Sequence, residues 1–171
     1  MSDAFHARPA RRFEADARAC ASPEIVFARL DDQTRLAEHM ERPSAIMGGG
    51  RMTYEFDEGR GMAVGSHIKM GGSAFGLQLF VDEVITERAP PWRKTWKTVG
   101  APRLLIIGAY DMGFDVAPTP GGSLVRVWIA YSLPTTRLGR VLGWLFGGLY
   151  ARWCVGRMAG DAARAFPIGA G

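Results

Sequence analysis

The chain has 171 residues, of which 47% are hydrophobic and 22% are charged. This balance is typical of a globular protein and excludes a disordered chain. The length suits one domain, so we expect a single domain over residues 1–171, with a flexible start at 1–11 and a flexible tail at 167–171. The net charge of +4 is spread along the sequence without a dense basic run or a nucleic-acid-binding signature, so we expect no nucleic acid as a partner.

The first predicted elements are a strand and two short helices. Residues 12–21 alternate between apolar and polar side chains, which predicts a half-buried strand. The segment Ser22 to Glu24 predicts the start of a helix, with serine as the N-cap and proline at the first helical position. Asp31 and Asp32 end this helix, and Gln33 to Met40 predicts a second short helix.

Alternation of apolar and polar residues returns at Met52 and continues, between tight turns, to Leu133. Short alternating segments joined by turns predict an antiparallel meander. We expect six strands, near 52–56, 64–70, 77–87, 92–99, 108–116 and 125–133. A long helix is then predicted from Thr136 to Ala165. The fold class is therefore α+β, with a curved antiparallel sheet of about seven strands wrapped around a long C-terminal helix.

Several short motifs follow one another at a consistent spacing. They are Ala21 to Phe27, Asp31-Asp32, Val64 to Ser66, Val84 to Pro91 with Trp96 after it, and Tyr131 to Pro134. Because these motifs occur in this order and at this spacing, the chain resembles members of the SRPBCC superfamily, and specifically a small single-domain bacterial member. The resemblance implies the helix-grip fold of START lipid-transfer domains, plant pollen-allergen relatives and polyketide cyclase/dehydrase proteins. Relatives often have tryptophan where this chain has His39-Met40.

This resemblance implies a fold more strongly than a function, because the superfamily includes lipid carriers, cyclases, hydrolases and co-chaperones. Its members enclose ligands between the sheet and the long helix, so we expect the inward side chains to bind a small apolar ligand. The alternative is that they pack a solid core. The predicted ligand-binding residues are Tyr54, Phe56, Ser66, Ile68, Met70, Trp96, Tyr110, Met112, Phe114, Ile129 and Tyr131 from the sheet, with Trp144 and Tyr150 from the long helix.

No catalytic group stands out among the acid–base residues. By alternation His67 and Glu83 face outward, as do Asp111 and Asp115, whereas Tyr54 and Tyr110 face inward without an evident base. Catalytic residues therefore stay unassigned, and whether the chain is an enzyme is left open. No metal-ligand spacing and no dinucleotide fingerprint occurs, so we expect neither a metal nor a cofactor.

The long helix carries an unusual glycine pattern. Gly139, Gly143 and Gly147 recur every four residues, and an interior glycine costs about 1 kcal/mol relative to alanine. Close approach of another element, within the fold or in a homodimer, would explain them, as would a lid that bends. Aromatic residues between flanking arginines also suit the surface of a membrane. This part of the helix should leave apolar surface exposed.

These observations give three functional expectations. The first is a carrier or sensor of a lipid, an isoprenoid or an aromatic polyketide-like molecule. The second is a polyketide-type aromatase/cyclase or dehydratase that acts in the same cavity, and the third is a membrane-peripheral or dimeric interaction module. Without a signal peptide, and with Cys20 and Cys154 expected as reduced thiols, we expect a cytoplasmic protein; peripheral membrane contact is the alternative.

Overall fold

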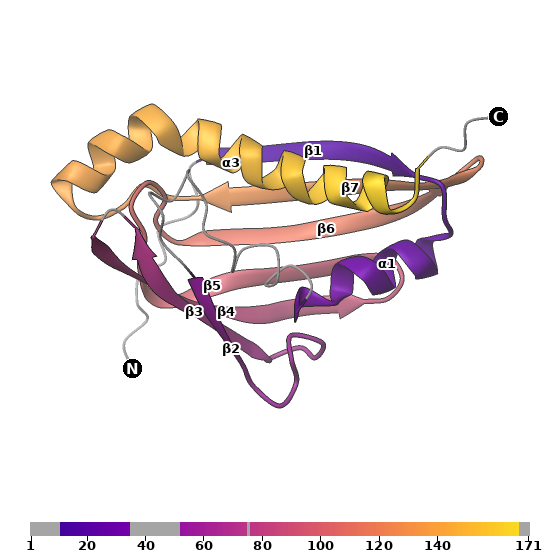
Figure 1. Ribbon diagram of the computed structural model, residues 1–171, viewed down its shortest axis with the longest axis horizontal. Coiled ribbons are helices and arrows are strands. Elements are labelled where there is room, and N and C mark those ends of the chain that lie inside the picture. The colour runs from indigo at the N-terminus through magenta and orange to yellow at the C-terminus, as the bar shows by residue number, and fades with distance from the viewer. Residues whose placement is uncertain (1–10, 35–51, 75, 168–171) are drawn as a thin grey trace.

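The computed structural model describes residues 11–34, 52–74 and 76–167, and the structural statements below concern these residues (Figure 1). Seven strands and two helices lie in this part of the chain. In order they are β1 (Arg11–Ala19), α1 (Pro23–Asp31), β2 (Met52–Phe56), β3 (His67–Ala74), β4 (Leu77–Ala89), β5 (Arg93–Arg103), β6 (Tyr110–Thr119), β7 (Gly122–Tyr131) and α3 (Arg137–Ala165).

All seven strands form one antiparallel sheet in the order β1-β7-β6-β5-β4-β3-β2. Strand β1 pairs with the last strand, so the meander from β2 to β7 is closed on one side by the start of the chain. Helix α3 lies along β1 and β7, and α1 lies across the same face of the sheet near β6 (Figure 1). The predicted fold class, a curved sheet that grips a long C-terminal helix, is confirmed.

Most predicted boundaries agree with the structure to within a few residues. The third strand is the main exception, because it begins at His67 and not at Val64. Gly65 has a positive φ of 85°, and the amide of Ser66 donates to the carbonyl of Ala63, so this segment is a turn. The predicted second helix, Gln33–Met40, and the predicted flexible ends fall largely outside the described residues.

A buried ion-pair network fastens the end of α1 to the sheet. Asp31 accepts hydrogen bonds from Arg88 on β4, at 2.7 Å, and from Lys94 on β5, also at 2.7 Å. The Lys94 side chain is fully buried and also donates to the backbone carbonyl of Asp31 at 3.0 Å. Phe27, one turn earlier in α1, packs against Phe114 on β6 with ring centroids 5.4 Å apart. Together these contacts fix α1 over one end of the sheet.

The glycines of α3 permit close approach within the fold. A Cβ atom on Gly143 would lie 2.7 Å from the backbone oxygen of Ile106, and one on Gly147 would lie 3.0 Å from that same oxygen. Gly147 also contacts the Tyr131 hydroxyl, which a Cβ would approach to 3.1 Å. By contrast, nothing lies within 4 Å of a Cβ on Gly156. The glycine spacing is therefore explained by packing of α3 on its own sheet and on the segment before β6.

Candidate functional site

The inner face of the sheet combines a packed part with a more open part. Ile68, Phe114, Ile129 and Tyr131 point inward and are buried. The other inward residues pack against this core but keep part of their surface accessible; they are Tyr54, Phe56, Met70, Met112 and, from α3, Tyr150. Trp96 is buried beside them, with its ring centroid 6.4 Å from that of Phe114. The structure thus brings most of the predicted ligand-binding residues together on one concave face.

Two predicted site residues lie elsewhere. Ser66 precedes β3, and its hydroxyl donates to Asp57 and accepts from the Gly61 amide, so it is used within the loop between β2 and β3. Trp144 is 66% exposed on α3. Its placement among the inward residues is corrected, because the buried side of α3 at this point is formed by Gly143 and Gly147.

A buried carboxyl group lies among the inward residues. Glu83 of β4 is only 6% exposed, and it occupies the same row across the sheet as Ile68 on β3 and Thr98 on β5. The prediction that Glu83 faces outward was therefore wrong. The neighbouring odd positions of β4, Leu79, Val81 and Ile85, are apolar, but the charge of Glu83 was given more weight than this alternation and suggested the solvent side.

Tyr110 is hydrogen-bonded to this carboxyl group. Its hydroxyl donates to Oε1 of Glu83, which lies two strands away. Thr98, on the intervening strand β5, has a small side chain. Its hydroxyl accepts a hydrogen bond from the backbone amide of Tyr110 at 3.1 Å. Trp96 also hydrogen-bonds Glu83. Tyr110, predicted to lack a partner, therefore belongs to a buried phenol–carboxyl pair.

The environment of Glu83 favours the protonated acid. Burial raises the pKa of Glu83 to about 7, although the hydrogen bonds from Tyr110 and Trp96 act in the opposite direction. The negative charge of Asp82 raises this pKa further, and the positive charge of Lys94 lowers it. A carboxyl group with a pKa near neutrality is present in both protonation states at neutral pH, so it is able to donate or accept a proton.

Helix α3 places two further polar groups on the opposite wall. The Tyr150 hydroxyl and the Cys154 thiol are hydrogen-bonded to each other, and Tyr150 is electrostatically coupled to Glu83 and Tyr54. Burial raises the pKa of the Cys154 thiol to about 11, so this thiol is neutral and not a reactive thiolate. The pKa of Tyr150 is raised by repulsion between its phenolate and a Cys154 thiolate, and also by burial. These groups therefore act as neutral hydrogen-bonding partners.

The Tyr131 hydroxyl is buried without a hydrogen-bond partner in the described part of the chain. It lies against Gly147 of α3, at the same end of the concave face as Tyr110, with which Tyr131 is in register. A buried hydroxyl without a partner costs roughly 1–3 kcal/mol.

Groups of three or more His, Cys, Asp or Glu side chains that could hold a metal ion do not occur in the described ranges.

Solved structures share this architecture. The di-domain ARO/CYC BexL from the BE-7585A biosynthetic pathway is similar with a TM-score of 0.65 and 18% identity, covering 93% of this chain and 50% of that one. Norcoclaurine synthase from Thalictrum flavum has a TM-score of 0.61 and 16% identity, covering 91% and 85% of the two chains. The ginseng major latex-like protein 151 from Panax ginseng has a TM-score of 0.55 and 16% identity, covering 92% and 98%.

No protein-family model and no curated protein sequence matches the chain. The structural similarity, at under 25% identity, is one of fold. It agrees with the order of the sequence motifs and with the strand order β1-β7-β6-β5-β4-β3-β2. The chain therefore has the helix-grip fold.

Proposed function

We propose that this protein binds a small hydrophobic molecule against the concave face of its sheet, beneath α3, as a carrier or sensor. The observation that carries this proposal is the group of partly accessible apolar side chains around a buried carboxyl–phenol pair. Apolar walls with a few placed polar groups are the usual composition of small-molecule sites. Tyr54, Met70 and Met112 would contact the apolar body of the ligand. Glu83 and Tyr110 would orient its single polar end.

The direct test is native mass spectrometry of the purified protein, followed by organic extraction of what travels with it. We expect a co-purifying lipid, isoprenoid or aromatic molecule. Met112→Trp, which adds bulk on the partly accessible concave face, should reduce the bound fraction at least about 10-fold, since a filled site excludes its ligand. Leu124→Trp is the matched control, because Leu124 lies on the opposite face of the sheet, between inward-facing residues of β7. This variant should retain the ligand. Equal loading of Met112→Trp and the unsubstituted protein would contradict the proposal.

A second candidate function, proton transfer on a bound carbonyl compound, is favoured by the Glu83–Tyr110 pair. The Glu83 carboxylate would remove a proton from a carbon next to a carbonyl group. Once Glu83 carries that proton it no longer takes the hydrogen bond of the Tyr110 hydroxyl, which would donate instead to the carbonyl oxygen where negative charge develops. In an intramolecular aldol cyclisation that carbanion attacks a second carbonyl of the same molecule, and the proton returns to the new alkoxide. The similarity in fold to an ARO/CYC protein and to norcoclaurine synthase supports this candidate.

This second candidate is tested by hydrogen–deuterium exchange at the α-carbon of an aromatic β-keto ester in D2O, read by mass spectrometry. We expect protein-catalysed exchange that Glu83→Gln lowers about 100-fold or more, because positioned general bases contribute roughly 10²–10⁴-fold. Binding of the ester should persist in this variant. Glu55→Gln, the same substitution at an exposed carboxyl group on β2 that lies outside the proposed site, is the control and should exchange normally. Exchange that is unaffected by Glu83→Gln would assign the pair to ligand orientation only.

A further inference from the structure

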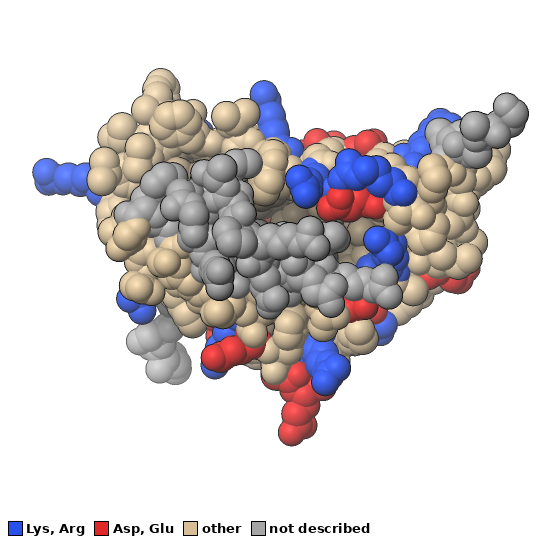
Figure 2. Space-filling model, in the orientation of Figure 1, with Lys and Arg blue, Asp and Glu red and all other residues tan. Residues whose placement is uncertain are grey.

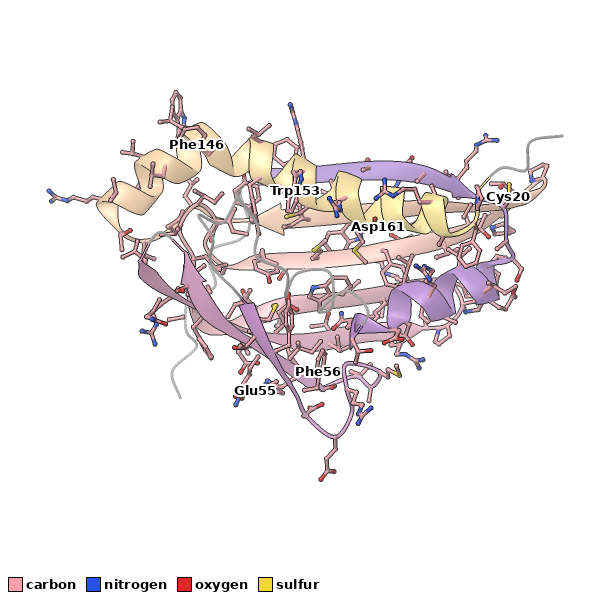
Figure 3. The ribbon with its side chains drawn as sticks, in the orientation of Figure 1. Cys20, Glu55, Phe56, Phe146, Trp153 and Asp161 are labelled. Carbon is pink, nitrogen blue, oxygen red and sulfur yellow. The ribbon has the colours of Figure 1, made fainter. Side chains whose placement is uncertain are left out.

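The first two-thirds of α3 expose an unusually large apolar surface. Leu138 is 69% exposed, Trp144 is 66% exposed and Leu149 is 70% exposed. Val141, Phe146 and Trp153 on the same helix are also exposed, and Figure 3 labels the last two. We call these six residues the α3 apolar surface. Soluble monomers rarely expose contiguous apolar patches of this kind unless the patch binds a partner.

Positive charge surrounds the α3 apolar surface. Arg137, Arg140, Arg152 and Arg157 are all exposed, and no aspartate or glutamate occurs from Arg137 to Gly160. The first acidic residue of the helix, Asp161, lies beyond this surface. In the space-filling view, the first turns of α3 are mainly uncharged surface from which single basic side chains project (Figure 2). A partner should therefore offer an apolar interior behind a negatively charged face.

A second copy of the chain fits this requirement poorly. Two such helices in contact would bring together four arginines from each copy, of which only Arg157 has an acidic partner on the helix, Asp161 at 3.8 Å, and juxtaposed like charges cost several kcal/mol. The small-residue face that two helices would use for close packing is not free either, since Gly143 and Gly147 already contact the Ile106 backbone. A bilayer with anionic headgroups satisfies both the apolar and the electrostatic requirement.

We propose that the α3 apolar surface docks the protein on an anionic lipid bilayer, with the helix lying in the plane of the headgroups. Tryptophan and arginine both suit this depth, because each carries an apolar body and a polar end. Insertion across the bilayer is not implied, since among the described residues no helix is long and apolar enough to span one. The surface is formed by side chains on the outer side of α3, so docking does not depend on what the concave face binds.

Co-sedimentation with vesicles tests this inference. We expect binding to vesicles of phosphatidylcholine mixed with phosphatidylserine, and at least about 10-fold weaker binding to phosphatidylcholine alone, since each basic residue near an anionic surface contributes on the order of fivefold. Binding should weaken as salt is raised. Light scattering of the protein without vesicles reports its mass in solution, which we expect to be that of one chain.

Two variants separate the apolar and electrostatic contributions. Trp144→Glu should lower binding at least about 10-fold, and the double variant Arg137→Glu with Arg140→Glu should abolish the preference for phosphatidylserine. Val64→Glu is the matched control, because Val64 is 63% exposed but lies in the loop before β3. The inference is overturned if Trp144→Glu binds as well as the unsubstituted protein, if neutral and anionic vesicles bind equally, or if Trp144→Glu instead dissociates a dimer.

Discussion

Replacing Glu83 with glutamine is expected to raise the free energy of unfolding by about 3 kcal/mol at pH 8 and to change it little at pH 4. Glu83 has a pKa of about 7 in the folded protein, against 4.5 as its ordinary value. An acid whose pKa is raised by folding makes its full contribution to stability only at pH values below its pKa in the unfolded chain. Between pH 4.5 and 7 the unfolded chain loses this proton first, so stability falls by about 1.4 kcal/mol for each pKa unit.

Urea unfolding of both proteins at pH 4, 6 and 8 measures the effect. The glutamine amide does not ionise, and its carbonyl oxygen still accepts the Tyr110 hydroxyl, so the hydrogen bond is kept while the pH-dependent loss disappears. Glu55→Gln is the control, because Glu55 is an exposed carboxyl on β2 and its replacement should change stability by no more than about 0.5 kcal/mol (Figure 3). Parallel pH profiles for Glu83→Gln and the unsubstituted protein would refute the assignment of a neutral buried acid.

Asp31→Ala is expected to destabilise the protein by about 3–5 kcal/mol. The substitution removes the carboxylate that Lys94 and Arg88 share and leaves the fully buried Lys94 ammonium without that negative charge. Breaking one side of a buried ion pair costs far more than the pair itself contributes, because the remaining charge stays desolvated. For a chain of this size such a loss lowers Tm by roughly 10 °C or more, measurable by thermal circular dichroism.

The exposed pair Asp16–Arg126 provides the matched control. Arg126 donates two hydrogen bonds to Asp16, both at 2.8 Å, from Nε to Oδ1 and from Nη2 to Oδ2, and Arg88 donates from the same two nitrogens to the same two oxygens of Asp31. Both side chains of this pair are more than 40% exposed, and exposed pairs contribute only about 0–1 kcal/mol. Asp16→Ala should therefore have little effect. Similar losses for the two variants would show that burial does not govern the Asp31 network.

The pKa of Lys94 is lowered by burial, although the hydrogen bond and the charge of Asp31 act to raise it. Asp31 itself shows the reverse balance: burial raises its pKa, but hydrogen bonds from Arg88 and Lys94 lower it more strongly. Deprotonated Asp31 is thus maintained by its two partners. The network therefore depends on Asp31, Arg88 and Lys94 together. Without it, the end of α1 would lose its hydrogen bonds to β4 and β5.

The alternation of side chains in β6 and β7 determined which of their residues face inward. Tyr110, Met112 and Phe114 share one parity, as do Ile129 and Tyr131, and the structure places each of them on the concave face. Clean alternation works here because each strand has one predominantly apolar side. Start and stop signals at Thr136 and Pro167 located α3, and the spread of its aromatic residues around the helix predicted the exposed apolar surface.

Only the tertiary structure decided the positions of Glu83, Asp31 and Lys94. The odd positions of β4 around Glu83 are apolar, so alternation placed Glu83 on the inward side, whereas its charge suggested the solvent side. The structure shows that it points inward, where Tyr110 and Trp96 satisfy it. Asp31 and Lys94 are 63 residues apart in sequence, and they meet because α1 packs on the sheet at β6, from where the end of the helix comes within reach of the Lys94 side chain. Local pattern determines which side of an element is apolar, whereas a buried charge depends on partners that only folding brings within hydrogen-bond distance.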